Sequence, residues 1–205
     1  MIATFQSKDE AEVELFLPTW TPGSYLLREY ARHLSQVKAT AGDDQRRLRC
    51  VKTNKNRFTV TTDGADSFQL SYRVYAHELT VRTAHLDDSH AYWNHACLLL
   101  WPIGQRHLSA RITVDHAPDW SLTCSLQASH AEPISAGYSA TTLHADNLDD
   151  ALDAPILIGK TQRLEWEVNG IPHAIVLDGL AGIAPPATLV EDLTKIVNQA
   201  AAVFG

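Results

Sequence analysis

The sequence predicts a mainly β protein, a two-layer β-sandwich with one α-helix at its C-terminal end. Three observations carry this prediction. Hydrophobic and polar residues alternate along many short segments, Pro- and Gly-containing turns separate those segments, and only the end of the chain shows helical spacing. The 205 residues, 45% hydrophobic and 20% charged, provide enough chain for one large β domain or for one domain plus a fragment of another.

The alternating segments are the predicted strands. Side chains on a strand point alternately to its two faces, so an apolar residue at every second position indicates one buried face. The clearest segments, in chain order, are residues 13–17, 68–76, 108–114, 120–126 and 164–168. The continuous apolar run at residues 96–101 is too short for its spacing to decide between a buried strand and a buried helical turn.

A corner follows the first of these strands, in the segment LPTWTPGSYLLREYARHL at residues 17–34. Pro18 ends the strand, and Pro22-Gly23 predicts a tight turn in which the glycine can take positive φ. The corner is expected to direct the chain away from the sheet, and the Trp20 side chain is expected to anchor the corner. Residue types alone favour a purely architectural role here.

The last residues change in character. Residues 181–187 are rich in Gly and Pro and predict a linker, and Thr188 with Glu191 forms a capping box. The apolar residues that follow at helical spacing are Leu189, Leu193, Ile196, Ala200 and Phe204. A lone amphipathic helix has no obvious partner after a β domain. We therefore divide the chain into a β-rich domain at 1–180, a linker at 181–187 and a helix at 188–205 that begins a further domain.

Composition narrows the classes of partner. Seventeen Lys and Arg against 24 Asp and Glu give a net charge of −7, which argues against nucleic acid and an anionic membrane surface as partners. No apolar run approaches the roughly 20 residues of a membrane span. No signal peptide is visible, and Cys50, Cys97 and Cys124 are widely spaced and predict free thiols. These features indicate a cytoplasmic protein.

The ten histidines raise the question of a metal. His77-Glu78 begins like the zinc signature HExxH, but position 81 is Val, so the second histidine is missing. His85, His90 and His95 are spaced by five and lie close to Asp87 in the sequence, a spacing that matches no metal-ligand set. We therefore assign no metal ligand in this chain.

The segment Tyr92-Trp93-Asn94 allows two interpretations that the residues leave open. It either caps the core, with Trp93 buried and Asn94 bonded to the backbone, or presents a polar and aromatic edge to a neighbouring cleft. The sequence shows no GxSxG motif, no P-loop and no GxGxxG motif opening a helix. No independent active site is apparent.

Three motifs carry a resemblance to a known family: residues 17–34 above, VYAHELTVRTAHLDDSHAYWNHACLLL at 74–100 and LDDALDAPILIG at 148–159. In this order and spacing, the chain from about Leu15 to Gly205 resembles the N-terminal region of glycyl aminopeptidases, which are zinc metallopeptidases that often carry a PDZ domain. The resemblance implies a saddle-like β domain preceding a thermolysin-like catalytic domain, which holds the zinc through HExxH and a distal Glu. This chain contains neither, so we expect it to bind no catalytic zinc and to be inactive alone.

The resemblance also implies roles for individual residues. By analogy with related aminopeptidases, the loop at 90–94 is the candidate for reaching the substrate cleft, with His90, Tyr92 and Asn94 contacting a peptide near its N-terminus. Trp20, Tyr25 and Arg28 in the corner are expected to face the catalytic domain, which would be the main partner. The expected function is thus a non-catalytic domain that shapes the substrate cleft of a zinc aminopeptidase.

Two alternatives remain from other classes of protein. One is a free-standing module that binds carbohydrate or peptide through exposed aromatic residues such as Trp93 and Trp101. The other is a small hydrolase or metal protein built on residues 85–95.

Overall fold

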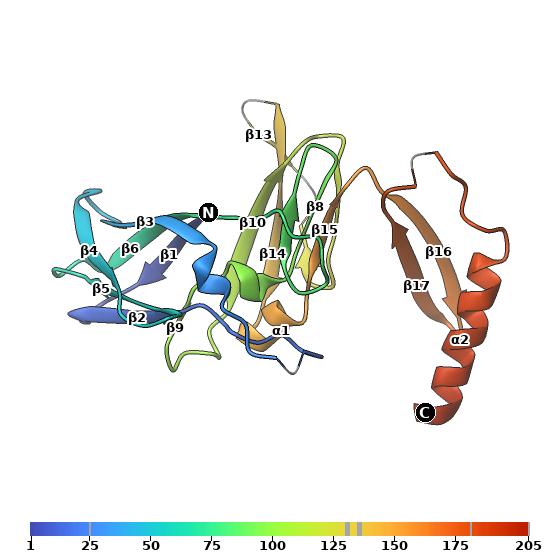
Figure 1. Ribbon diagram of the computed structural model, residues 1–205, viewed down its shortest axis with the longest axis horizontal. Coiled ribbons are helices and arrows are strands. Elements are labelled where there is room, and N and C mark those ends of the chain that lie inside the picture. Colours follow the sequence, from blue (N-terminus) through green and yellow to red (C-terminus); the bar gives the residue numbers. More distant parts are fainter. Residues whose placement is uncertain (25, 130–131, 135–136, 181, 205) are drawn as a thin grey trace.

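The computed structural model describes residues 1–205 except 25, 130–131, 135–136, 181 and 205. It is mainly β and consists of curled antiparallel sheets with one long C-terminal helix (Figure 1), which confirms the predicted fold class. Three predicted positions lie outside the described residues: Tyr25 in the corner, Ala181 at the start of the linker and Gly205 at the chain's end.

The largest sheet has seven strands in the order β1-β6-β3-β4-β5-β2-β9. Its strands are β1 (Ile2–Gln6), β2 (Glu12–Phe16), β3 (Leu34–Ala41), β4 (Arg47–Lys52), β5 (Arg57–Thr61), β6 (Ser67–Val74) and β9 (Trp101–Pro102). The sequence of β6 shows why it forms: Phe68, Leu70 and Tyr72 are buried, while the residues between them are only half-buried. Burying one such face drives the pairing of the strands.

Two four-stranded sheets follow in the chain. One contains β10 (Ala110–His116), β12 (Gln127–Ala128), β13 (Glu132–Ile134) and β14 (Tyr138–Ala145); the other, in the order β11-β15-β8-β7, contains β7 (Ala84–Leu86), β8 (His90–Trp93), β11 (Ser121–Thr123) and β15 (Ile156–Gly159). Short helical segments are η1 (Tyr30–Arg32), η2 (His95–Cys97) and α1 (Leu148–Leu152). Trp93 and Ala110 pack against both hydrophobic clusters of the core and so join the sheets.

The structure differs from the sequence-based expectation, or decides between alternatives, in three local segments. The segment predicted as a loop at 90–94 is mostly strand β8, which lies inside its sheet between β15 and β7. Within the run at 96–101 the backbone forms the helical turn η2 first and reaches a strand only at Trp101, so the helical alternative was correct for its start. Of the segment predicted at 120–126, only β11 pairs with a neighbouring strand.

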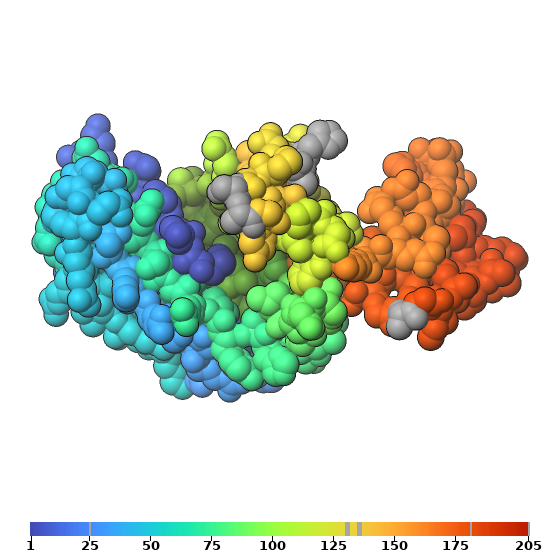
Figure 2. Space-filling model, turned by 90° about the horizontal axis from the view of Figure 1, so that it is seen from above, coloured from blue at the N-terminus to red at the C-terminus, as the bar shows by residue number. Residues whose placement is uncertain are grey.

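The C-terminal part forms a lobe of its own, seen in orange and red in Figure 2 beyond a narrow neck. Strands β16 (Gln162–Val168) and β17 (Ile171–Leu177) pair with each other, and α2 (Leu189–Phe204) packs beside β16. No residue of α2 is buried among the described residues, and Ile196 and Phe204 of its apolar stripe are exposed. No helix among the described residues is long and apolar enough to cross a membrane.

One buried hydrogen bond ties the large sheet to the segment after η2. The Tyr72 hydroxyl donates to the Leu98 carbonyl at 2.6 Å, and burial raises the pKa of Tyr72 to about 12. We expect Tyr72→Phe to lower the free energy of unfolding by about 1–2 kcal/mol, because the buried carbonyl loses its donor. Urea unfolding measures this, with the exposed Tyr75→Phe as the control; equal stability of both variants would contradict the expectation.

Candidate functional site

An open cleft of about 560 Å³ brings the three sequence motifs together. It is lined by the corner (Thr21, Pro22, Gly23 and Ser24), by Val81, Arg82 and Asn94 of the middle motif, and by Leu152, Asp153 and Pro155 of the last motif. Segments more than 100 residues apart in the chain, as 21 and 153 are, meet here because η2 packs on both η1 and α1. The cleft is thus the candidate functional site.

Asn94 is held rigidly at the base of this cleft. Its side-chain oxygen accepts from the Ala96 amide at 2.9 Å, which caps η2, and its amide nitrogen donates to the Leu152 carbonyl at 3.2 Å. The side chain is buried, so both of its polar groups are already bonded within the chain. This geometry matches the core-capping interpretation: in this conformation Asn94 positions the wall of the cleft.

The other two predicted substrate contacts lie further along β8. His90, Tyr92 and Asn94 share one face of the strand, which rises about 3.3 Å per residue, so His90 and Asn94 are roughly 13 Å apart. The Tyr92 hydroxyl donates to the Val81 carbonyl at 3.2 Å beside the cleft. His90 lies at the opposite end of the strand and belongs to a different group of side chains.

Trp20 and Arg28, two of the predicted interface residues, lie in the corner next to the residues that line the cleft. Trp20 is 42% exposed, and the neighbouring Leu26 and Leu27 are also exposed. Arg28 is half-buried; its backbone amide donates to the Thr19 carbonyl at 2.8 Å, and its Nε has no partner among the described residues. The helical turn in this segment is η1, which begins at Tyr30.

The cleft also contains two charged groups that are not among the predicted site residues. Arg82 and Asp153 are both exposed, and both line the cleft although they are far apart in the sequence. Asp153 ends α1, where its backbone amide donates to Asp149. Each lies inside one of the three motifs, which is the only sequence signal that singles them out.

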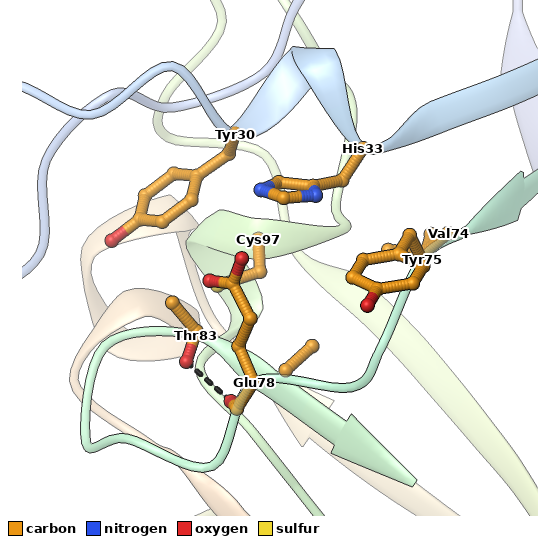
Figure 3. Close-up of a pocket in the computed structure, with 8 residues that line it drawn as sticks. Tyr30, His33, Val74, Tyr75, Glu78, Thr83 and Cys97 are labelled. Atoms are coloured by element: carbon orange, nitrogen blue, oxygen red, sulfur yellow. Dashed lines mark hydrogen bonds between the residues drawn. The ribbon is translucent and has the colours of Figure 1, made fainter.

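A second, much smaller cavity lies between η1, η2 and the end of β6 (Figure 3). Its volume of about 10 Å³ holds no more than one water molecule. Cys97 lines it, and burial raises the pKa of this thiol to about 12, while Sγ donates to the Arg82 carbonyl. A thiol in this state is a packing residue and not a nucleophile. Cys50, Cys97 and Cys124 are all free, as predicted.

The histidines and tryptophans named in the sequence separate in the structure. His85, Asp87 and His90 come together, whereas His95 is fully buried beside Trp93, with ring centroids 6.4 Å apart. Trp101 is also buried, and its indole N–H donates to the Gln105 carbonyl at 2.9 Å. Trp101 therefore presents no exposed surface to a carbohydrate.

The ligand set of a catalytic zinc does not fit this chain. His77 and Glu78 lie in an extended segment in which His77 bridges His85, and no second histidine follows at position 81. HExxH requires two histidines on one helical face.

Comparisons with known proteins place the chain in a class of peptidase domains. The family model for the Peptidase M61 N-terminal domain matches residues 2–160, and the chain belongs to this family. The resemblance to glycyl aminopeptidases is consistent with that assignment. No curated protein matches the sequence.

Two solved structures show different degrees of similarity to this chain. The crystal structure of an aminopeptidase N family protein from Idiomarina loihiensis is similar with a TM-score of 0.82 and 31% identity over 96% of this chain. This chain spans only 32% of that structure's length. An M1 zinc metallopeptidase from Deinococcus radiodurans gives a TM-score of 0.45 at 13% identity over 94% of this chain and 46% of that one.

Proposed function

We propose that this chain is a non-catalytic domain that packs against a zinc-dependent aminopeptidase domain of the same protein and shapes its substrate cleft. The observation that carries the proposal is the meeting of the three family-like motifs at one open cleft. Membership of the Peptidase M61 N-terminal domain family supports it, as does the similarity to an aminopeptidase N family protein of which this chain spans a third.

The surface around the cleft has the character of a domain interface. The segments that line it are flanked by exposed apolar side chains: Trp20, Leu26, Leu27, Leu79 and Val81. Exposed large apolar side chains gathered in one surface region mark interaction sites, and these five come from the two segments that also line the cleft. We propose that the catalytic domain packs against this surface, with Arg28 at the edge of the contact.

A boundary near residue 160 fits this proposal better than one near residue 180. The family model ends at residue 160, and β16, β17 and α2 form the separate lobe. We propose that this lobe begins the catalytic domain, which would cover the exposed stripe of α2.

The proposal gives the cleft residues separate roles. Arg82 and Asp153 supply charges that a peptide with a free amino group and a polar backbone can contact. Asn94 and Tyr92 are positioning residues, because their polar groups bond to the chain itself. The second candidate function, a free-standing peptide-binding module, would use the same cleft without a catalytic domain.

The test is made in the full-length parent protein. We expect Asp153→Asn to lower kcat/KM for short peptides about tenfold, mainly through a higher KM, because the variant removes a charge that faces the substrate. Asp119→Asn is the matched control, since Asp119 is also exposed but pairs with Lys160 at 2.7 Å, away from the cleft.

If kcat/KM is unchanged in both the Asp153→Asn and the Arg82→Gln variants, peptide substrates do not contact the cleft. Saturable binding of the same peptides to the isolated 205-residue chain would favour the binding module instead.

A further inference from the structure

A cluster of three metal-ligating side chains lies at the hairpin β7–β8, apart from the cleft, and a further carboxylate, that of Asp178, lies beside one of them. His85 Nε2 is 3.0 Å from one oxygen of Asp87, and His90 Nδ1 is 3.5 Å from the other. His90 Nδ1 also lies 3.7 Å from an oxygen of Asp178, in the segment after β17. The ligand atoms of His85, Asp87 and His90 all fall within 4.8 Å of one another.

These separations suit a tetrahedral metal ion. With metal–ligand bonds of about 2.0–2.1 Å, neighbouring ligand atoms in such a site lie roughly 3.4 Å apart. The three distances, of 3.0, 3.5 and 3.7 Å, lie around that value, with the two oxygens of Asp87 each facing one histidine and Asp178 facing His90 alone. A spacing of five residues suggested no ligand set, because the hairpin turn and not a helix brings His85 and His90 together.

The hydrogen bonds around Asp87 prepare its carboxylate for this role. One of its oxygens accepts from the Ser89 amide, the Ser89 hydroxyl and the His90 amide at 2.7–3.0 Å, and these bonds hold the pKa of Asp87 below its usual range. The other oxygen faces His85. Partners of this kind orient a metal ligand before the ion arrives.

The two imidazoles are likewise held in place. The His85 side chain is only 10% exposed and its ring lies 4.8 Å from that of His90, centroid to centroid. His85 Nδ1 is buried without a partner among the described residues, which leaves Nε2 as the nitrogen that faces the cluster. Gly159 packs so closely on β8 that an added Cβ would lie 2.9 Å from the Cβ of His90.

Charge and ligand type point to one class of ion. Two carboxylates balance the charge of a divalent cation, which removes most of the cost of burying it. Two imidazole nitrogens favour zinc and related transition metals over calcium or magnesium, which take oxygen ligands.

We propose that His85, Asp87, His90 and Asp178 bind one divalent transition-metal ion, best matched by zinc, which ties the C-terminal lobe to hairpin β7–β8. This site is separate from the catalytic zinc expected elsewhere in the parent protein. It goes beyond the proposed function, and its test needs no peptidase activity.

The experiment uses the 205-residue chain, purified without a metal-binding tag and stripped with chelator. Titration with Co²⁺ is expected to give the visible absorption of a tetrahedral site, saturating at one ion per chain, and Zn²⁺ is expected to displace it. Zn²⁺ should also raise the Tm, since a ligand that binds only the folded state stabilises it. Asp178→Asn is expected to weaken Co²⁺ binding at least tenfold, and His90→Gln to abolish the absorption.

His107→Gln and His144→Gln are the matched controls, because both histidines are exposed outside the cluster. They should bind Co²⁺ as the parent chain does. Should a histidine variant fail to fold, Asp178→Asn decides the outcome, with its fold checked by Tm in chelator. The proposal is overturned by the absence of saturable Co²⁺ absorption, by affinity unchanged in Asp178→Asn, or by equal loss in the control variants.

Discussion

Acidification from neutral pH to about pH 4 is expected to lower the free energy of unfolding by roughly 3 kcal/mol through one side chain, His95. His95 is fully buried, and neither ring nitrogen has a partner among the described residues. Burial lowers the pKa of His95 to about 4, because desolvation disfavours the charged ring.

The direction of this pH effect follows from the protonation of His95 in the folded and in the unfolded chain. Above the ordinary histidine pKa of about 6.5, His95 is neutral in both states and contributes no pH dependence. Between that value and about 4, the unfolded chain binds a proton that the folded chain does not, so stability falls. Below about 4 both states are protonated at this residue, and its effect stops growing.

Urea unfolding at a series of pH values measures the effect. The variant His95→Leu has no titratable ring and a side chain of similar size, so its stability relative to the parent chain should rise by roughly 3 kcal/mol on acidification. His107→Gln, at an exposed histidine, should leave the pH dependence nearly unchanged. Parallel curves for His95→Leu and the parent chain would contradict the assignment.

Asn94→Ala is expected to lower the free energy of unfolding by about 3 kcal/mol. The substitution removes the cap on η2 and leaves the Leu152 carbonyl without the donor that Asn94 supplies. Both losses lie in a buried region, where an unpaired polar group is most costly. Thermal and urea unfolding of the 205-residue chain measure the change.

Two further variants separate the cap from the buried link. Asn94→Ser keeps a capping oxygen but cannot reach Leu152, so we expect about half of the loss. Asn147→Ala removes a cap of the same kind at the exposed N-terminus of α1 and should cost about 1 kcal/mol. If Asn94→Ala is as stable as the parent chain while KM rises in the full-length enzyme, Asn94 contacts peptide directly.

Much of the fold could be predicted because it depends on local patterns. β6 alternates cleanly, the residues of α2 recur at helical spacing, and Asn147 precedes a short run that forms α1. β8 escaped prediction because it is only four residues long and follows a segment rich in Asp, Ser and His that is typical of a loop. Its place between β15 and β7 makes it a strand, and that placement is a tertiary effect.

The candidate sites were only partly predictable for the same reason. Asn94 was identified from its residue type and neighbours, but its bond to Leu152 joins positions 58 residues apart. The grouping of His85 with His90 depends on the register of the β7–β8 hairpin, in which His85 lies opposite Tyr92. Sequence spacing contains no information on that register when the turn is unknown.

Strand β8 connects the two sites described above, because it carries His90 at one end and leads directly into Asn94 at the other. Strands β15 and β7 pair with it on its two sides and fix its course. The histidine cluster and the cleft therefore share one structural element, which sets the distance between them.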